Sequence, residues 1–170
     1  DPIARVIDFG FARKLDTDKY CTCHNQTYCF SGPEIHRHDP HTFSADIWSL
    51  GATFYYIVTH KRIIKSKNET EQLNEALHPS VDYENKNDDE RNFGGFFPTS
   101  GRDLIKRMLN PAPEERPNAD AVKNDPFFLE VLGQEYIDDP LKNSEFLERE
   151  KRMKFKGIEE LIGDDILIEF

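Results

Sequence analysis

Residues 44–59 form an apolar segment that leaves a helix almost no polar side. The apolar side chains are Ile47, Trp48, Leu50, Phe54, Tyr55, Ile57 and Val58. A surface helix carries polar residues on its outer face, whereas a helix that is apolar nearly all round is buried. We therefore expect one long helix at the centre of a domain, with the rest of the chain packed around it.

Five short motifs follow one another along the chain. They are Asp8-Phe9-Gly10, Ser31-Gly32-Pro33-Glu34, Asp46-Ile47-Trp48-Ser49-Leu50-Gly51, Asp103-Leu104-Ile105-Lys106-Arg107-Met108-Leu109 and Pro113-Glu114-Glu115-Arg116. Their order and spacing resemble the large lobe of a eukaryotic protein kinase over roughly residues 3–128. The resemblance implies a mainly α fold, the helical large lobe of that family, in which residues 44–59 are the central helix.

The resemblance divides the chain into two parts. Residues 1–128 match the kinase lobe, with residues 8–34 as its activation segment, and residues 129–170 form an acidic, amphipathic tail. In the family, a Gly-rich loop, a strand lysine and a His-Arg-Asp catalytic loop all precede the Asp-Phe-Gly motif. Only seven residues precede that motif here. We therefore expect a fragment that lacks the N-terminal β lobe and is inactive by itself.

Local patterns predict the smaller elements. The expected elements are a strand at 3–7, a loop at 11–31, and helices at 69–77, 100–109, 118–124 and 143–162. Asn118 is expected to cap the helix that follows it, because asparagine side chains accept hydrogen bonds from the first backbone N–H groups. For residues 143–162, a disordered acidic tail is the alternative to an amphipathic helix.

The Asp8-Phe9-Gly10 motif carries the chemistry that the resemblance implies. Transfer of a phosphoryl group from ATP develops negative charge on phosphoryl oxygens, and a carboxylate-held Mg²⁺ neutralises that charge. By resemblance, Asp8 is the Mg²⁺ ligand, Phe9 packs beneath it, and Gly10 allows the backbone torsions that reorient the motif. Taken alone, the triplet would be an ordinary turn after a strand.

Thr27 stands five residues before Gly32, where serine/threonine kinases carry a threonine that helps to position the substrate hydroxyl. The proline-containing segment that tyrosine kinases have here is missing, so the resemblance favours serine/threonine specificity. The chain departs from the family pattern at Phe30, where Tyr is usual, and at Gly32, where Ala is usual. We expect Gly32 to loosen the loop without removing a reactive group. An ordinary loop threonine is the alternative for Thr27.

Four residues are expected to build the scaffold. By resemblance, Glu34 and Arg116 form a buried ion pair, since either charge buried alone is costly. Asp46 begins the central helix, where a carboxylate can accept backbone N–H bonds and suits the positive end of the helix dipole. In the family this aspartate bonds the backbone of the catalytic loop. Trp48, in the same motif as Asp46, is also expected to be structural.

The expected loop contains clustered cysteines. Cys21, Cys23 and His24, with Cys29 nearby, raise the alternative of a zinc site. Two cysteines separated by one residue are poorer zinc ligands than the usual spacing. Reduced loop cysteines are therefore expected, with a redox-sensing loop as the minor alternative.

The same loop contains hydroxyl groups that can accept phosphate. Thr22 is the first candidate, followed by Thr17 and Tyr20. A phosphate adds up to two negative charges and orders such loops by pairing with arginines.

Charge limits the partners that this chain can bind. The first 66 residues carry 8 basic and 7 acidic side chains, whereas residues 67–170 carry 14 basic and 25 acidic ones. The simplest interpretation of the acidic excess in residues 67–170 is a solvated surface. The alternative is an attraction for basic protein substrates. Because the sequence shows no cluster of basic residues, neither nucleic acid nor an anionic membrane is expected as a partner. No apolar run reaches the length of about 20 residues that spans a bilayer.

Three cysteines, an odd number, predict no disulfide framework, and the start Asp-Pro-Ile-Ala-Arg is not a signal peptide. A cytoplasmic or nuclear location is therefore expected. We expect a serine/threonine protein kinase that uses ATP and Mg²⁺, of which this chain is a part. A non-catalytic pseudokinase or a truncated interaction module is the alternative. The pattern indicates neither the substrate, the kinase subgroup nor the oligomeric state.

Overall fold

The computed structural model describes residues 6–12, 15, 20–21, 27–83 and 97–132. In these residues the fold is helical and contains no strand, apart from one isolated antiparallel bridge between Cys21 and His41. The elements are η1 (Phe9–Phe11), η2 (Tyr28–Phe30), α1 (Pro33–His36), α2 (Ser44–Thr59), α3 (Glu69–Leu77), α4 (Thr99–Met108), η4 (Pro113–Glu115), α5 (Ala119–Lys123) and α6 (Pro126–Leu132). The chain divides into two compact units, Asp1–Phe127 and Phe128–Phe170, and the predicted site residues all lie in the first. The predicted mainly α fold is confirmed.

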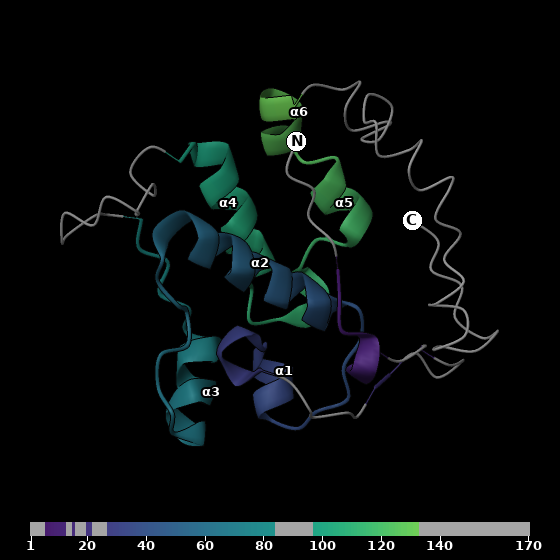
Figure 1. The fold of residues 1–170 in the computed structure, drawn as a ribbon, viewed down its shortest axis with the longest axis vertical. Coiled ribbons are helices and arrows are strands. Elements are labelled where there is room, and N and C mark those ends of the chain that lie inside the picture. The colour runs from purple at the N-terminus through teal and green to yellow at the C-terminus, as the bar shows by residue number, and fades with distance from the viewer. Residues whose placement is uncertain (1–5, 13–14, 16–19, 22–26, 84–96, 133–170) are drawn as a thin grey trace. The chain divides into compact units, whose positions relative to one another are not determined.

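Helix α2 lies at the centre of the first unit, with α4 beside it, and has the bounds that its sequence predicts (Figure 1). Its buried residues are Ala45, Ile47, Trp48, Gly51, Ala52, Tyr55 and Thr59. Turns η2 and η4 also contact α2. The helix therefore connects segments that lie far apart in the sequence.

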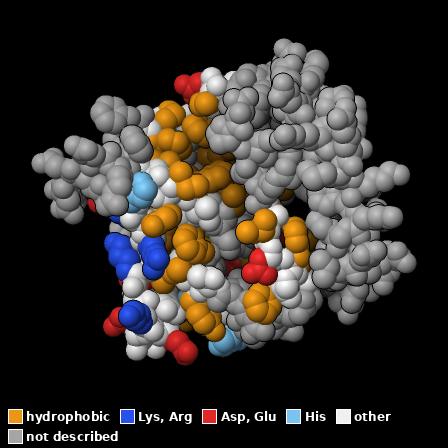
Figure 2. Space-filling model, viewed as in Figure 1, with side chains coloured by type: hydrophobic (Ala, Val, Ile, Leu, Met, Phe, Trp, Pro, Cys, Tyr) orange, Lys and Arg blue, Asp and Glu red, His pale blue; other side chains and the backbone are white. Residues whose placement is uncertain are grey.

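The opposite side of α2 is exposed, so the prediction of burial all round is wrong for this structure. Leu50 and Tyr56 are each 37% exposed, and Ile57 is 59% exposed. Figure 2 shows hydrophobic side chains spread across the face in view. The apolar pattern overestimated burial because it does not reveal how many neighbouring elements pack on the helix.

Helix α4 packs closely against α2 where α2 carries Gly51. A Cβ atom at Gly51 would lie only 2.8 Å from Cβ of Met108. The missing side chain therefore allows the two helices to approach. The apolar stripe of α4 is buried as its spacing predicts; its members are Leu104, Ile105 and Met108, with Leu109 just beyond the helix end.

Asparagine side chains cap two of the shorter helices. Oδ1 of Asn68 accepts a hydrogen bond from the Glu71 backbone N–H at 3.2 Å, at the start of α3. Oδ1 of Asn118 accepts from the Ala121 N–H at 2.8 Å, at the start of α5. The predicted Asn118 cap is thus confirmed. Such caps satisfy backbone donors that have no partner inside the helix.

Two predicted elements differ from the structure or lie beyond it. Val6 and Ile7 are not in a strand and are both more than three-quarters exposed, so the part of the predicted strand at 3–7 that the structure describes is wrong. A short apolar run predicts a strand only when a neighbour pairs with it. The predicted helix at 143–162 lies outside the described residues.

Asp125 lies immediately before the last described helix, α6, and makes two contacts. Its Oδ1 accepts a hydrogen bond from the Phe127 N–H at 2.9 Å, and its Oδ2 pairs with the Arg107 guanidinium. Asp125 is buried, and these two contacts satisfy its carboxylate. The aspartate therefore joins α4 to the start of α6.

None of the helices that the structure describes has both the length and the apolar character required to cross a bilayer.

Candidate functional site

Asp8 lies at a left-handed corner of the backbone. Its φ and ψ are 64° and 67°, and the 3₁₀ turn Phe9–Phe11 follows directly. The Ala12 N–H donates to the Phe9 carbonyl at 2.9 Å and closes that turn. Few residue types accept a left-handed corner, and aspartate is among the more tolerant. The Asp8 side chain is exposed, whereas Phe9 is half-buried.

The carboxylate of Asp8 lies over Gly10. A Cβ atom at Gly10 would be 3.3 Å from Oδ1 of Asp8. A side chain at this position would therefore press on the carboxylate. Gly10 thus leaves room for the position that the Asp8 carboxylate adopts.

The chemistry of Asp8 fits one ligand position for Mg²⁺. Magnesium prefers oxygen ligands, and a single carboxylate together with phosphate oxygens and water is a common set. Among the described residues no group of three or more His, Cys, Asp or Glu side chains is placed to hold a metal ion.

Thr27 caps the 3₁₀ turn Tyr28–Phe30 with its backbone, not with its side chain. Its carbonyl accepts hydrogen bonds from the Phe30 N–H at 2.9 Å and from Oγ of Ser31 at 3.3 Å. The turn has no side-chain cap, and Thr27 is exposed. The backbone at Thr27 is thus held by local bonds while its side chain faces solvent.

Glu34 and Arg116 meet in a buried two-pronged ion pair. Nη1 of Arg116 donates to Oε1 of Glu34 at 2.6 Å, and Nη2 donates to Oε2 at 2.8 Å. The Glu34 side chain is only 3% exposed, and the Arg116 side chain is 0% exposed. Residues 82 positions apart in the sequence are therefore joined by the strongest type of carboxylate contact.

Three backbone carbonyls complete the surroundings of the Arg116 guanidinium. Nε donates to the Asn110 carbonyl at 2.7 Å, Nη1 to the Ser44 carbonyl at 2.8 Å, and Nη2 to the Pro111 carbonyl at 3.4 Å. Together with the Glu34 bonds, these contacts satisfy the buried cation. We call Glu34, Arg116 and these carbonyls the clamp. Sequence motifs cannot predict which carbonyls belong to the clamp, because every residue has a backbone carbonyl group.

Trp48 packs beneath the clamp. The Arg116 guanidinium carbon lies 5.0 Å from the centre of the Trp48 ring, a cation–π contact. Trp48 is fully buried, and its Nε1 has no hydrogen-bond partner among the described residues. The structure therefore places Glu34, Arg116 and Trp48 in one cluster.

Gly32 leaves room for the Glu34 carboxylate. A Cβ atom at Gly32 would lie 2.7 Å from Oε2 of Glu34, closer than side chains approach. The φ of Gly32 is −74°, which any residue adopts. Space beside the clamp, rather than backbone freedom, is therefore what the glycine supplies.

Asp46 lies in the first turn of α2. The surrounding protein raises the pKa of Asp46 by burying part of the carboxyl group, and the nearby His41 partly opposes this effect, although the residue as a whole stays exposed. No hydrogen bond from a backbone N–H to this carboxylate is found in the described part of the chain. The structural role expected of Asp46 therefore stays a prediction.

His36 closes the short helix α1 and packs on turn η2. Its ring centre lies 5.7 Å from that of Tyr28. Burial lowers the pKa of His36, and hydrogen bonding with the backbone at Ser31 and Tyr28 opposes this effect. The ring therefore favours the neutral form and serves as a packing group.

The candidate phosphate acceptors and cysteines are only partly described. Tyr20 is 65% exposed, whereas Thr17 and Thr22 lie outside the described residues. Cys21 exchanges backbone hydrogen bonds with His41 at 2.7 and 2.9 Å. Cys21 and Cys29 are free thiols, and Cys23 and His24 lie outside the described residues.

The described structure therefore separates scaffold residues from candidate reactive ones. Glu34, Trp48 and Arg116 are buried, whereas Asp8 and Thr27 are exposed on separate turns, and the remaining scaffold residue, Asp46, is also exposed. No hydrogen bond joins Asp8 to Thr27 among the described residues. Ser31 belongs to a motif but had no assigned role, and the structure shows that it is buried and donates a hydrogen bond to the Thr27 carbonyl.

Comparison with known proteins places this arrangement in a family. The family model of the protein kinase domain matches residues 1–128. Serine/threonine-protein kinase ATG1 of Debaryomyces hansenii is 31% identical over 150 residues, which are 85% of this chain and 16% of that protein. Mitogen-activated protein kinase 9 of Oryza sativa subsp. japonica is 27% identical over 192 residues, covering 96% of this chain and 27% of that kinase.

A third relative, serine/threonine-protein kinase PLK4 of Nematostella vectensis, is 28% identical over 140 residues, covering 80% of this chain and 13% of that kinase. The chain thus spans less than a third of the length of each of these three relatives. The matched residues include the motif at Asp8, the clamp and the central helix α2. The chain belongs to the eukaryotic serine/threonine protein kinase family.

Proposed function

We propose that this chain supplies the Mg²⁺-binding motif and the substrate-positioning segment of a protein serine/threonine kinase, which transfers the γ-phosphoryl group of ATP to protein hydroxyls. The observation that carries the proposal is the clamp. It fastens Glu34, at the end of the segment that begins at Thr27, to the turn at Arg116 and to α2. Thr27 itself stays exposed. A fixed backbone with an accessible hydroxyl suits the orientation of a substrate hydroxyl.

Asp8 would hold Mg²⁺ in this reaction. Bound Mg²⁺ supplies charge neutralisation on the phosphoryl oxygens during transfer. The support is the exposed carboxylate at a corner that leaves its oxygens accessible, with Gly10 making room beneath it. Thr27 would contact the substrate hydroxyl, and Asp46 would hold the backbone of another segment of the intact kinase, as the family resemblance implies.

The 170 residues contain neither a Gly-rich phosphate loop nor a His-Arg-Asp motif. A kinase needs both, together with a strand lysine, to place ATP and the substrate hydroxyl. We therefore propose that this chain alone transfers no phosphoryl group and that the intact protein, which would also contain those parts, is the enzyme. Protein substrates and a cytoplasmic or nuclear location are part of this proposal.

The test is a phosphorylation assay on the full-length protein with labelled ATP, Mg²⁺ and a generic basic protein. Asp8→Asn should lower the rate at least about a hundredfold, because the carboxylate ligand of the metal is lost. Asp120→Asn is the matched control, since Asp120 is exposed on α5, and it should leave the rate unchanged. Thr27→Ala should lower the rate, and Thr27→Ser should restore part of it.

Phosphate on tyrosine, or a rate that Asp8→Asn leaves unchanged, would contradict the proposal. A second candidate is a non-catalytic interaction module, which the exposed apolar side of α2, with Leu50 and Ile57, favours. It would be supported by a full-length protein that folds and binds partners through α2 but transfers no phosphate.

A further inference from the structure

The exposed residue Thr27 stands close in sequence to a buried run of the chain. Residues 31–35 are all buried, whereas Thr27, four residues before Ser31, is exposed. The clamp fixes the buried run through Glu34. A side chain of this run that bonds Thr27 would therefore set the position of an exposed, candidate reactive residue relative to the core.

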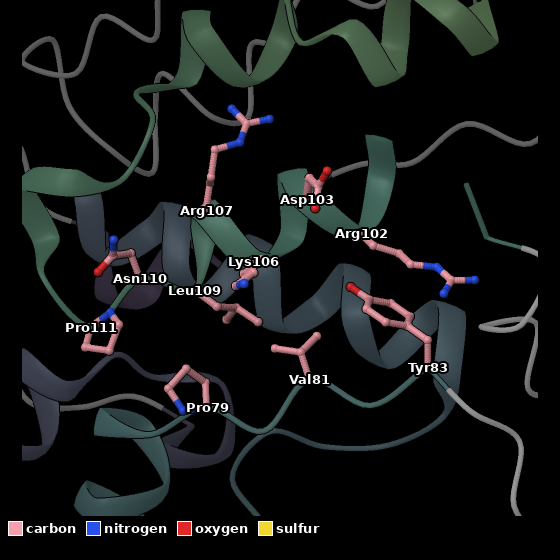
Figure 3. A pocket seen from close by; sticks show the side chains of 10 residues that line it. All are labelled: Pro79, Val81, Tyr83, Arg102, Asp103, Lys106, Arg107, Leu109, Asn110 and Pro111. Carbon is pink, nitrogen blue, oxygen red and sulfur yellow. The ribbon is translucent and has the colours of Figure 1, made fainter. Parts of the chain in front are cut away.

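The buried run is anchored to the turn after α4. The carbonyls of Asn110 and Pro111 accept hydrogen bonds from Arg116 at 2.7 and 3.4 Å. Both residues lie in the wall of a cavity of about 850 Å³ (Figure 3). Because Arg116 also holds the Glu34 carboxylate, the buried run is tied to the helical core at a point far along the sequence.

Ser31 makes the side-chain bond that reaches back to Thr27. Its Oγ donates to the Thr27 carbonyl at 3.3 Å. Ser31 is only 1% exposed, and a buried hydroxyl group without a hydrogen bond is unfavourable. The burial of Ser31 therefore favours keeping its bond to Thr27.

Two backbone bonds support the same turn. The Phe30 N–H donates to the Thr27 carbonyl at 2.9 Å, and the Ser31 N–H donates to the Tyr28 carbonyl at 3.1 Å. The Thr27 carbonyl thus accepts two hydrogen bonds, one for each of its lone pairs. Two donors restrict the orientation of the peptide group at Thr27 more than one donor does.

The turn itself packs on the central helix. Turn η2 contacts α2, and the centre of the Phe30 ring lies 6.1 Å from that of Tyr56 in an edge-to-face contact. Thr27 is β-branched, so its side chain has few rotamers once its backbone is set. Holding the Thr27 backbone therefore also restricts the direction of the Thr27 hydroxyl.

We propose that Ser31 is a positioning residue for Thr27. The buried Ser31 hydroxyl holds the Thr27 backbone, so that the Thr27 hydroxyl meets the substrate hydroxyl in the orientation that phosphoryl transfer requires. This inference rests on the proposed function, since it concerns the same segment. Ser31 acts through Thr27 and not on the substrate, because its own side chain is buried.

The test measures kcat and KM for phosphorylation of a generic basic protein by the full-length protein. Ser31→Ala should lower kcat about tenfold, because a misplaced group slows the transfer step, and should leave the KM for ATP unchanged. Ser31→Thr keeps the hydroxyl, and the extended backbone of residue 31, with φ and ψ of −96° and 144°, suits a β-branched side chain. It should therefore retain most of the rate.

Ser49→Ala is the matched control. Oγ of Ser49 donates to the Ala45 carbonyl at 3.2 Å, also four residues back, but inside α2, so its loss should leave kcat unchanged. A double-mutant cycle separates positioning from a merely structural role. In the Thr27→Ala background, Ser31→Ala should lower kcat by less than about twofold, because the group that Ser31 positions is already missing.

Amide hydrogen exchange in the full-length protein gives a result that does not depend on activity. Ser31→Ala should speed exchange at the Phe30 N–H about threefold to tenfold, because the carbonyl that accepts this bond is held less firmly, and Ser49→Ala should not. Equal losses of kcat in the parent and Thr27→Ala backgrounds, or unchanged exchange at Phe30, would overturn the inference. A full-length protein that transfers no phosphate would instead overturn the proposed function, and exchange at Phe30 would still decide whether Ser31 holds Thr27.

Discussion

Gly32 leaves space for a neighbouring side chain, which differs from the role that the sequence suggested for it. Compared with the alanine that is usual in the family, a glycine suggested a looser loop. The structure instead shows a φ that any residue adopts and a carboxylate of Glu34 that occupies the volume of a Cβ atom. At the residue scale, the glycine therefore allows a tight clamp rather than a mobile segment.

Gly32→Ala should lower the free energy of unfolding by about 1–3 kcal/mol, since an added methyl group forces a buried, paired side chain to move. Urea denaturation of the chain measures this change. Gly10→Ala is the control, because its Cβ would meet only the exposed Asp8 carboxylate, at 3.3 Å, and it should cost less. A Gly32→Ala chain as stable as the parent would show that the clamp tolerates the methyl group.

Asp46 gives the chain a pH-dependent instability. The pKa of Asp46 in the folded state is raised by burial, so folding favours the protonated carboxyl group. The stability that protonation contributes is lost as the pH rises through the folded-state pKa. Asp46→Asn should therefore increase stability above that pKa, and the gain should vanish as the pH falls below the unfolded-state value. Denaturant midpoints from pH 3 to pH 8 measure it, with Asp120→Asn as the control for the lost negative charge. A gain that does not depend on pH would contradict this account.

At the scale of elements, the helices that the sequence defines by caps and periodicity are the ones it predicts well. α2 and α3 have the predicted bounds, and Asn118 caps α5. The strand expected near residue 3 fails at its described end, because a strand depends on a pairing partner that local sequence does not specify. The burial of α2 was also overestimated, because burial depends on how many other elements pack on the helix, and local sequence does not specify this number.

The contact between α2 and α4 yields a prediction for Gly51. Gly51→Ala should destabilise the chain by about 1–3 kcal/mol, because its Cβ would lie 2.8 Å from that of Met108. The change opposes intrinsic propensity, which favours alanine over glycine in a helix by about 1 kcal/mol. Thr53→Ala, on the exposed side of α2, is the control and should change stability little. Thermal unfolding measures both, and a more stable Gly51→Ala chain would show that the helices separate easily.

On the scale of the whole molecule, motifs indicated which side chains matter, and the structure shows how they are held. The sequence indicated Glu34 and Arg116 as partners, but the two-pronged geometry and the carbonyls of Ser44 and Asn110 required the fold. Thr17, Thr22 and the tail at 143–162 stay predictions.

The central claim is that the clamp holds residues 27–34 on the helical core. A double-mutant cycle on Glu34→Gln and Arg116→Leu, measured by urea denaturation, tests it most directly. Each single change leaves a buried partner unpaired and should cost about 3–5 kcal/mol. The double variant should be much less destabilised than the sum of the two, by about 1–3 kcal/mol. Simple additivity of the two losses would contradict the clamp.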